Sequence, residues 1–328
     1  MRVAGIDCGT NSIRLLIAEA GRDGGLRDIV RRMEVVRLGQ GVDATGEFAR
    51  EALERTFART QEYADLCREH GVQSIRFAAT SAARDARNRE AFIEGIRSRI
   101  GVEPQILTGQ EEARASFEGA ASAIPAGVDG PVLTVDLGGG STELALGLPG
   151  GQILGSFSMD VGCVRLHERH LVSDPPSPGQ IAGARADVRA MLDRAEEHID
   201  LGATTAVIGL AGTVTTLTAT ALGLERYDPW RIHGAVLTVR QTLEVCEWYL
   251  RSTREERAGL GFMHPGRVDV ISSGALVWGE IVRRVERRMA ESGRELSGIT
   301  TSEHDILDGL AIWAARQPQA PDARVLGV

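Results

Sequence analysis

The sequence predicts an α/β protein built from two similar domains, each a mixed β-sheet flanked by helices. Its 328 residues are enough for two domains. Short apolar segments alternate along the chain with longer amphipathic segments, the pattern of strands and helices in α/β proteins. A strand–turn–strand segment also occurs twice, at residues 2–20 and again at residues 131–149. A duplicated unit of this kind suggests two similar domains whose turns face one cleft.

The two copies of this segment align without a gap at an offset of 129 residues. The matched positions are Asp7 with Asp136, Gly9 with Gly138, Ser12 with Ser141, and Leu15 with Leu144. Each copy reads as an apolar strand, an Asp-x-Gly-x-x-Ser turn and a second strand. Two unrelated hairpins could share a glycine turn, but four matches in one register favour duplication.

The first half of the chain continues the alternation of strands and helices. We expect a strand at Glu34–Leu38 and then a helix at about Glu47–His70, which Gly71 ends. The expected elements after it are a buried strand at Ser74–Ala79, a helix that begins within Thr80–Asn88 and runs to Ile100, a strand at Gln105–Leu107, and a helix opened by Thr108–Arg114.

The second half follows the same pattern after a linker candidate, the Gly-, Ala- and Pro-rich segment Ala120–Pro131. The expected elements after the second hairpin are a strand at Gln152–Ser158, a helix that starts within Met159–Leu166, a loop at Ser173–Gly179, a polar helix to about His198, a strand at Thr205–Gly209, a helix capped by Ala211–Thr213, a long helix at about Arg267–Ala290, a strand at Ser297–Thr301 and a helix at Glu303–Ala315. The Pro- and Ala-rich tail beyond Gln317 is expected to fray.

These elements give a division into two domains. The first domain takes residues 1–124 together with residues 305–328, because the C-terminal helix is expected to pack back on it. The second domain takes residues 125–304. No additional C-terminal helical domain is expected.

Composition limits the classes of function. The net charge of −8 excludes a bulk nucleic-acid binder. The sequence contains no lysine, so any cationic contact to phosphate must come from arginine, whose forked guanidinium suits phosphate oxygens. The four cysteines are far apart and form no metal-type pair, which favours reduced thiols in a cytosolic protein.

No segment predicts a targeting signal or a membrane span. The apolar residues at the N-terminus belong to a strand that ends at Asp7 and lack the pattern of a signal peptide. The uncharged segment Gly202–Leu224 contains seven threonines and a Gly-Leu-Ala-Gly turn. A strand followed by a buried helix explains it better than a membrane span does. We therefore expect a cytoplasmic protein with no membrane partner.

The two Asp-x-Gly hairpins are the main candidates for a site. Glycine turns let backbone N–H groups converge on an anion, and a serine hydroxyl can add a further contact. The phosphate-binding candidates are therefore Gly9, Thr10, Asn11 and Ser12 in the first turn and Gly138, Gly139, Gly140 and Ser141 in the second. Asp7 and Asp136 end apolar strands, where a carboxylate can hold a metal or cap the turn. Two such residues in matched repeats favour the metal.

Further candidates lie at the beginnings of helices and just after the second glycine turn. Glu111 and Glu112 stand on the first turn of a helix, where either could orient a water and where acidic residues also complement the helix dipole. The sequence pattern alone does not show whether Glu111 or Glu112 orients the water. Glu143 follows the second glycine turn and is another candidate for water or metal. Gly212 and Thr213 begin a helix and form a third, weaker anion-site candidate. No histidine pair has the spacing of a zinc site.

Together these motifs resemble the Ppx/GppA phosphatases, the exopolyphosphatases and guanosine pentaphosphate phosphohydrolases of the acetate/sugar kinase, heat-shock 70 and actin superfamily. The resemblance covers nearly the whole chain and rests on GIDCGTNSIRLLI, RLGQGV, ATSAARDARN, ILTGQEEAR, VDLGGGSTEL, MDVGCVRL, GLAGTVTTL and the helix after MHPGR. It implies two duplicated ribonuclease H-like domains of the actin and heat-shock-70 type, with an active site in the cleft between them.

The resemblance also implies roles for particular residues. It implies Mg²⁺-dependent hydrolysis of a terminal phosphoanhydride, with Mn²⁺ as the alternative metal. The family's catalytic glutamate falls on Glu112, and its second important glutamate falls on Glu143. Asp136, with Asp7, would hold the metal. The two glycine turns would hold the terminal phosphate, and Arg84 with Gly212 and Thr213 would hold the penultimate groups.

Two departures from the family pattern affect the expected substrate. Longer members carry an extra C-terminal helical domain related to HD-type phosphohydrolases, which this sequence lacks, so we expect a preference for shorter polyphosphates. The family's Leu-Arg-Glu-Gly at the last helix is replaced by Ile306-Leu307-Asp308-Gly309. We expect the absence of this arginine to affect either substrate choice or a local ion pair.

The preferred function is exopolyphosphatase, with inorganic polyphosphate as substrate and a homodimer as a candidate assembly. Hydrolysis of guanosine pentaphosphate (pppGpp) or another nucleotide is the first alternative, although no motif demonstrates a pocket for a base. An actin-like clamp that binds nucleotide or polyphosphate without turnover is the non-enzyme alternative. A sugar or acetate kinase is the fourth hypothesis, and it would require a phosphate acceptor.

Overall fold

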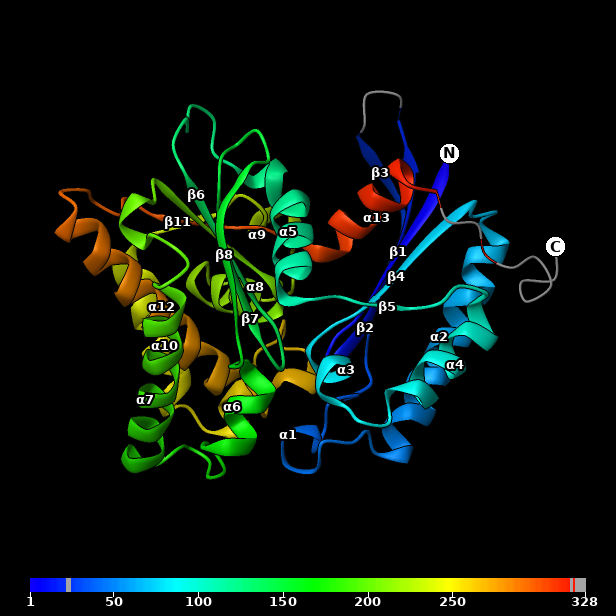
Figure 1. The fold of residues 1–328 in the computed structure, drawn as a ribbon. Coiled ribbons are helices and arrows are strands. Elements are labelled where there is room, and N and C mark those ends of the chain that lie inside the picture. Colours follow the sequence, from blue (N-terminus) through cyan, green and yellow to red (C-terminus); the bar gives the residue numbers. More distant parts are fainter. Residues whose placement is uncertain (22–24, 319–320, 322–328) are drawn as a thin grey trace. The chain divides into compact units, whose positions relative to one another are not determined.

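The computed structural model describes residues 1–21, 25–318 and 321 (Figure 1). The chain forms two compact units, one of Met1–Gly119 with the segment from Ile306 onward and the other of Ala120–Asp305. The expectation that the chain frays beyond Gln317 falls almost entirely outside the described residues. None of the helices in the described part of the chain is both long and apolar enough to cross a membrane.

The first unit is built on a five-stranded mixed sheet in the order β3-β2-β1-β4-β5. The strands are β1 (Arg2–Cys8), β2 (Ser12–Ala20), β3 (Leu26–Val35), β4 (Ser74–Ala79) and β5 (Gln105–Ile106). β1 pairs antiparallel with β2 and parallel with β4. The helices are α1 (Val42–Thr45), α2 (Arg50–Glu69), α3 (Ser81–Asp85), α4 (Arg89–Ile100), α5 (Gly109–Gly119) and α13 (Ile306–Arg316).

Helices cover both faces of this sheet (Figure 1). Apolar residues of β1 pack on one face with side chains of α2 and α4, among them Tyr63 and Phe92. On the other face Val3 packs with Leu307 and Ala311 of α13. The alternation of side chains along β1 explains why one strand serves both layers. α13 lies so close to β1 that a side chain at Gly5 would come within 2.8 Å of a backbone oxygen.

The second unit is built on a six-stranded mixed sheet in the order β10-β11-β9-β6-β7-β8. The strands are β6 (Val132–Leu137), β7 (Thr142–Gly147), β8 (Ile153–Met159), β9 (Ala206–Leu210), β10 (Val236–Leu237) and β11 (Ile299–Thr301). The helices are the 3-10 turns η1 (Ala120–Ala123), η2 (Leu201–Ala203) and η3 (Pro265–Arg267), with α6 (Cys163–Arg169), α7 (Pro178–Ala195), α8 (Ala211–Ala221), α9 (Pro229–Ile232), α10 (Val239–Arg251), α11 (Arg254–Ala258) and α12 (Ile271–Glu291).

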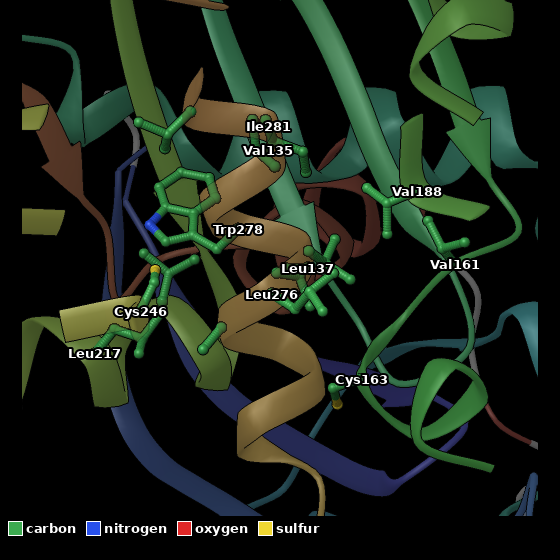
Figure 2. Close-up of a cluster of buried hydrophobic side chains, with 14 of the residues drawn as sticks. Val135, Leu137, Val161, Cys163, Val188, Leu217, Cys246, Leu276, Trp278 and Ile281 are labelled. Atoms are coloured by element: carbon green, nitrogen blue, oxygen red, sulfur yellow. The ribbon is translucent and has the colours of Figure 1, made fainter. Parts of the chain in front are cut away.

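The core of the second unit surrounds α12. Figure 2 shows Leu276, Trp278 and Ile281 of this helix beside Val135 and Leu137 of β6. Side chains of α7, α8 and α10 belong to the same cluster, including the buried Val188, Leu217 and Cys246. The first half of α12, residues 271–282, is buried on all sides and lies between other elements, whereas the second half is amphipathic and exposes Glu286 and Arg287.

The structure corrects three expected elements of the first unit. The strand expected at Glu34–Leu38 is β3, which lies earlier and is longer. Its charged residues hid it from the apolar pattern, because an edge strand keeps both faces partly exposed. The single helix expected up to Ile100 is two helices, because Ala86 is extended between α3 and α4. The helix expected from Glu303 begins at Ile306.

In the second unit, β9 followed by the buried α8 confirms the prediction that Gly202–Leu224 contains a strand and a buried helix.

The departure at the last helix has a local explanation. Leu307 lies in the apolar cluster beneath α13, where an arginine would be buried. Asp308 is nearly buried and accepts hydrogen bonds from Arg31 of β3 at 2.5 and 3.2 Å. Burial alone would lower the pKa of Arg31, but the bond to Asp308 outweighs it and raises that pKa. The departure therefore coincides with a β3–α13 ion pair within the first unit.

Candidate active site

The two hairpins of the duplication share one turn geometry. In the first unit the N–H of Gly9 donates to the carbonyl of Ser12 at 3.0 Å. In the second unit the N–H of Gly138 donates to the carbonyl of Ser141, also at 3.0 Å. The strands on either side are antiparallel and in equivalent register. The turns predicted from the repeated motif are therefore equivalent in three dimensions.

In the second unit, the beginning of α6 lies against the glycine turn. The carbonyl of Gly138 accepts from the N–H of Cys163, and the carbonyl of Gly139 accepts from Val164 and Arg165. A side chain at Gly162 would come within 2.6 Å of the Gly139 backbone, so only glycine allows this approach. Because each trans peptide places its carbonyl and the next N–H on opposite sides, the N–H groups of Gly139 and Gly140 point away from α6. They are available to an anion.

In the first unit, the segment after β3 packs against the turn, and it contacts the turn one residue further along than α6 does in the second unit. The carbonyl of Thr10 accepts from Gly39, and the carbonyl of Asn11 accepts from Val36 and Arg37. Arg37 adopts a φ of 50°, a strained left-handed conformation for a non-glycine residue.

Within the described residues, the Thr10 hydroxyl of this turn is buried without a hydrogen-bond partner. Leaving such a hydroxyl unsatisfied costs free energy, so a ligand oxygen fits the site.

The residues that face the two aspartates across the hairpins differ. Asp7 lies opposite Arg14 in the strand pairing and accepts from its guanidinium at 2.7 and 2.9 Å. Asp136 lies opposite Glu143. Both acidic side chains of the second hairpin are buried, and Glu143 accepts from the Ser158 hydroxyl at 2.7 Å. Two neighbouring buried carboxylates fit a divalent cation, whereas a carboxylate bonded to arginine fits one less well.

The two adjacent glutamates of α5 have different environments. Glu111 forms a reciprocal capping box with Thr108: its carboxylate accepts from the Thr108 N–H at 2.8 Å, and its own N–H donates to the Thr108 hydroxyl at 3.2 Å. Glu112 is only 6% exposed and accepts from the Arg84 guanidinium at 2.5 Å. The structure thus assigns a helix-capping role to Glu111 and places Glu112 in a buried ion pair.

Arg84 is held on α3, which begins directly after β4. Its Nη1 also donates to the carbonyl of Leu107 at 3.0 Å. At the other end of α3, the N–H of Thr80 donates to the carbonyl of Cys8 at 3.3 Å, beside the first turn. In the first unit, Asp7, the turn and α3 therefore gather where the parallel strands β1 and β4 end, the usual position of sites in α/β sheets.

In the second unit, α8 begins at the equivalent edge of the sheet. β9 runs parallel to β6, and Asp136 lies level with Leu210, the last residue of β9. Ala211 then adopts a φ of 67°. A side chain at Gly212 would come within 2.3 Å of the Arg267 guanidinium. Thr213 is buried, and its neighbour Thr216 lies 3.3 Å from Arg267 Nη1. Gly212 and Thr213 therefore share the edge of the sheet at which Asp136 lies.

The cysteines nearest the turns are not suited to nucleophilic chemistry. Burial raises the pKa of Cys163 to about 11, even though Thr213 and Arg267 act in the opposite direction. Burial, with the nearby charge of Asp7, also raises the pKa of Cys8. A thiolate is the reactive form, so both groups stay protonated and inert at neutral pH.

Sequence reasoning missed the partners of several site residues. No sequence motif marks the partners of Arg14 and Arg267, because strand pairing and packing set them. Tyr227 and Glu303, which join the first turn of α8 to the end of the sheet, carried no motif. Arg114 pairs with Glu118 on the exposed side of α5 and is an ordinary surface charge.

Comparison with known proteins agrees with this architecture. A model of the Ppx/GppA phosphatase family matches residues 16–294. Exopolyphosphatase 2 of Mycobacterium tuberculosis is 45% identical over 96% of this chain and 98% of its own length. A crystal structure of an exopolyphosphatase-like protein, also 45% identical, has a TM-score of 0.93 and covers 96% of this chain and 98% of that one.

More distant solved structures share the fold. An exopolyphosphatase from Cytophaga hutchinsonii is 25% identical with a TM-score of 0.85, covering 96% of this chain and 97% of its own. A family member from Aquifex aeolicus is 28% identical with a TM-score of 0.78, covering 97% of this chain and 98% of its own.

The fold and the paired hairpins define a two-domain α/β protein of the actin and heat-shock-70 type, which confirms the predicted fold class. Within that class, the chain belongs to the Ppx/GppA phosphatase family.

Proposed function

We propose that this chain is an exopolyphosphatase that hydrolyses the terminal phosphoanhydride of inorganic polyphosphate and releases orthophosphate. The observation that supports it most is the second hairpin. There the N–H groups of Gly139 and Gly140 point away from α6, and the turn lies next to the buried pair Asp136 and Glu143. The 45% identity to Exopolyphosphatase 2 supports polyphosphate as the substrate.

The donor set fits Mg²⁺, with Mn²⁺ as the alternative. Among the described residues, no three acidic, histidine or cysteine side chains come together as a complete metal cage. Mg²⁺ commonly takes one or two carboxylates and completes its shell with water and substrate phosphate. Asp136 and Glu143 would hold it, and Asp7 is the weaker candidate because Arg14 engages it. When bound, the ion would offset the charge of the phosphate oxygens.

The other residues receive roles from their positions. The N–H groups of Gly139 and Gly140, with the Ser141 hydroxyl, would bind oxygens of the terminal phosphate. The turn of Gly9, Thr10, Asn11 and Ser12 would bind phosphate in the same manner.

Two further groups of residues complete the proposed mechanism. Glu112 would accept a proton from the attacking water and orient it, with Glu143 assisting. Gly212 and Thr213, with Arg84, would hold the penultimate groups.

A phosphate-release assay tests this proposal. The substrates are polyphosphates of defined length, pppGpp, ATP and ADP, each with and without Mg²⁺ or Mn²⁺. We expect metal-dependent release from polyphosphate, fastest on the shorter chains. If phosphate were released from pppGpp but not from polyphosphate, pppGpp and not polyphosphate would be the substrate. Binding of polyphosphate without any release would favour a non-catalytic clamp and overturn the proposal.

Two further parts of the proposal concern the setting of the protein. We propose a cytoplasmic location, in keeping with four free and buried cysteines, and fractionation of the source cells tests it. We also propose a homodimer, which light scattering on the purified chain tests. A monomer at all concentrations would contradict it.

A further inference from the structure

A hydrogen-bonded chain joins the first turns of α8 to the segment that follows β11. The Tyr227 hydroxyl lies 2.8 Å from the Thr215 hydroxyl and donates to the Glu303 carboxylate at 2.6 Å. A phenol has one proton, and a carboxylate only accepts. Tyr227 therefore gives its proton to Glu303 and offers its lone pairs to Thr215. Burial, followed by the charge of Glu303, raises the pKa of Tyr227, so the phenol keeps this proton.

The Glu303 end of this chain is fixed by backbone contacts. The N–H of Glu303 donates to His233 Nδ1 at 3.3 Å, and the N–H of Gly234 donates to the carbonyl of Thr301 at 2.8 Å. The His233 ring packs against the His304 ring at an interplanar angle of 40° with centroids 4.6 Å apart, and His304 Nδ1 lies 2.8 Å from the Ser122 hydroxyl. Tyr227 is thus bonded to the carboxylate of a residue whose backbone is anchored.

The Thr215 end belongs to a helix start that needs support. Leu210, which precedes α8, provides no side-chain cap, and Ala211 adopts the strained φ of 67°. The Thr216 hydroxyl donates to the carbonyl of Gly212 at 2.6 Å. The Thr215 hydroxyl, which donates its one proton to Tyr227, lies 3.4 Å from the same carbonyl. Because Thr215 lies three residues after Gly212 at the beginning of α8, a shift of Thr215 would move Gly212 and the N–H groups there.

We propose that Tyr227 is a positioning residue, which Glu303 holds in place so that Thr215 fixes the first turn of α8 for phosphate groups behind the terminal one. This inference rests on the proposed roles of Gly212 and Thr213. Loss of the Tyr227 hydroxyl would weaken the binding of a phosphate chain and would leave Glu112 and the second hairpin unchanged. The effect should therefore appear in KM and not in kcat.

The same helix offers a matched control. The Tyr249 hydroxyl lies 2.7 Å from the Thr220 hydroxyl, toward the other end of α8. Tyr249→Phe removes the same chemical group and the same type of tyrosine–threonine bond from the same helix. It leaves the first turn intact.

The test measures steady-state phosphate release from tripolyphosphate and from a long polyphosphate for the wild type, Tyr227→Phe and Tyr249→Phe. We expect Tyr227→Phe to raise KM about fivefold, the effect of one hydrogen bond, with kcat within about twofold of the wild type. KM for Tyr249→Phe should stay within about twofold. Glu303→Gln keeps an oxygen that accepts from Tyr227, so its KM should lie nearer the wild type than that of Glu303→Ala.

Each outcome decides between the two proposals. An active wild type with equal KM in the two phenylalanine variants overturns the positioning role alone. A wild type that releases no phosphate from polyphosphate overturns the proposed function, and the positioning role with it. Thermal melting shows whether Tyr227→Phe is folded. If it is not, Thr215→Val breaks the same bond from the other side and must show the same KM increase.

Discussion

Asp136 lies opposite Glu143 across the β6–β7 hairpin, whereas its counterpart in the other unit, Asp7, lies opposite Arg14. Glu143 and Arg14 occupy equivalent positions of the duplicated segment. One copy therefore pairs two carboxylates and the other pairs a carboxylate with a guanidinium. The two copies share the same turn but differ in the charge of the residue that faces the aspartate. The hairpin of Asp136 and Glu143 therefore suits a metal ion better than the hairpin of Asp7 and Arg14.

The first prediction follows from that difference. Asp136→Asn should weaken Mn²⁺ binding at least about tenfold, because even indirect partners of a metal commonly contribute about that much. Asp7→Asn should change it by less than about threefold, since Arg14 already engages Asp7. Electron paramagnetic resonance of free Mn²⁺ measures both without any turnover. Equal losses in the two variants would show that both hairpins hold metal.

The second prediction uses the adjacent glutamates of α5. Glu112→Gln should lower kcat for phosphate release by about 10²-fold or more, because the amide cannot accept a proton from water. Glu111→Gln should leave kcat within about twofold, since glutamine also serves in a capping box. The two substitutions are chemically identical and one residue apart. A similar kcat in both variants would refute the role of Glu112.

The third prediction concerns the close approach of α6 to the glycine turn. Gly162→Ala places a methyl group within 2.6 Å of the Gly139 backbone. It should lower the free energy of unfolding by about 1–3 kcal/mol and raise KM, because α6 must move away from the turn.

Gly150→Ala is the control for this variant, because a side chain at Gly150 meets no atom within 4 Å. Chemical denaturation of both variants measures the difference. An unchanged free energy of unfolding in Gly162→Ala would contradict the observed approach.

The fourth prediction is a pH dependence of stability from the cysteines. Burial raises the pKa of Cys67 and Cys246 to about 12, and that of Cys163 to about 11. A raised pKa in the folded state means that the folded chain holds these protons more tightly. Their stabilisation is therefore complete below the unfolded value of about 8.5 and is lost as the pH rises from there toward 11–12.

Thiol labelling checks this prediction directly. The native protein at pH 8 should react slowly with a thiol reagent, and the protein in denaturant should label all four cysteines. The free energy of unfolding should be lower at pH 10 than at pH 8. Rapid labelling of the native protein at pH 8 would show that the thiols are accessible.

Local patterns accounted for most of the strands and helices around the site. The Asp-x-Gly turns, β4, β9 and α8 could be predicted because each depends on a short apolar run and on the turn chemistry that follows it. β3 was misplaced because an edge strand carries charges on both faces. The short α9 and β10 gave no periodic signal at all, since four and two residues are too few to show one.

The sequence by itself determined that the chain repeats an aspartate–glycine hairpin and that phosphate-type turns end its strands. These features are local, and glycine and aspartate dictate them wherever they occur. Only the tertiary structure decided which glutamate caps α5 and which pairs with Arg84, 28 residues earlier. It also joined Tyr227 to Glu303, 76 residues apart. Such pairs depend on strand register and helix packing, which no short segment of the sequence contains.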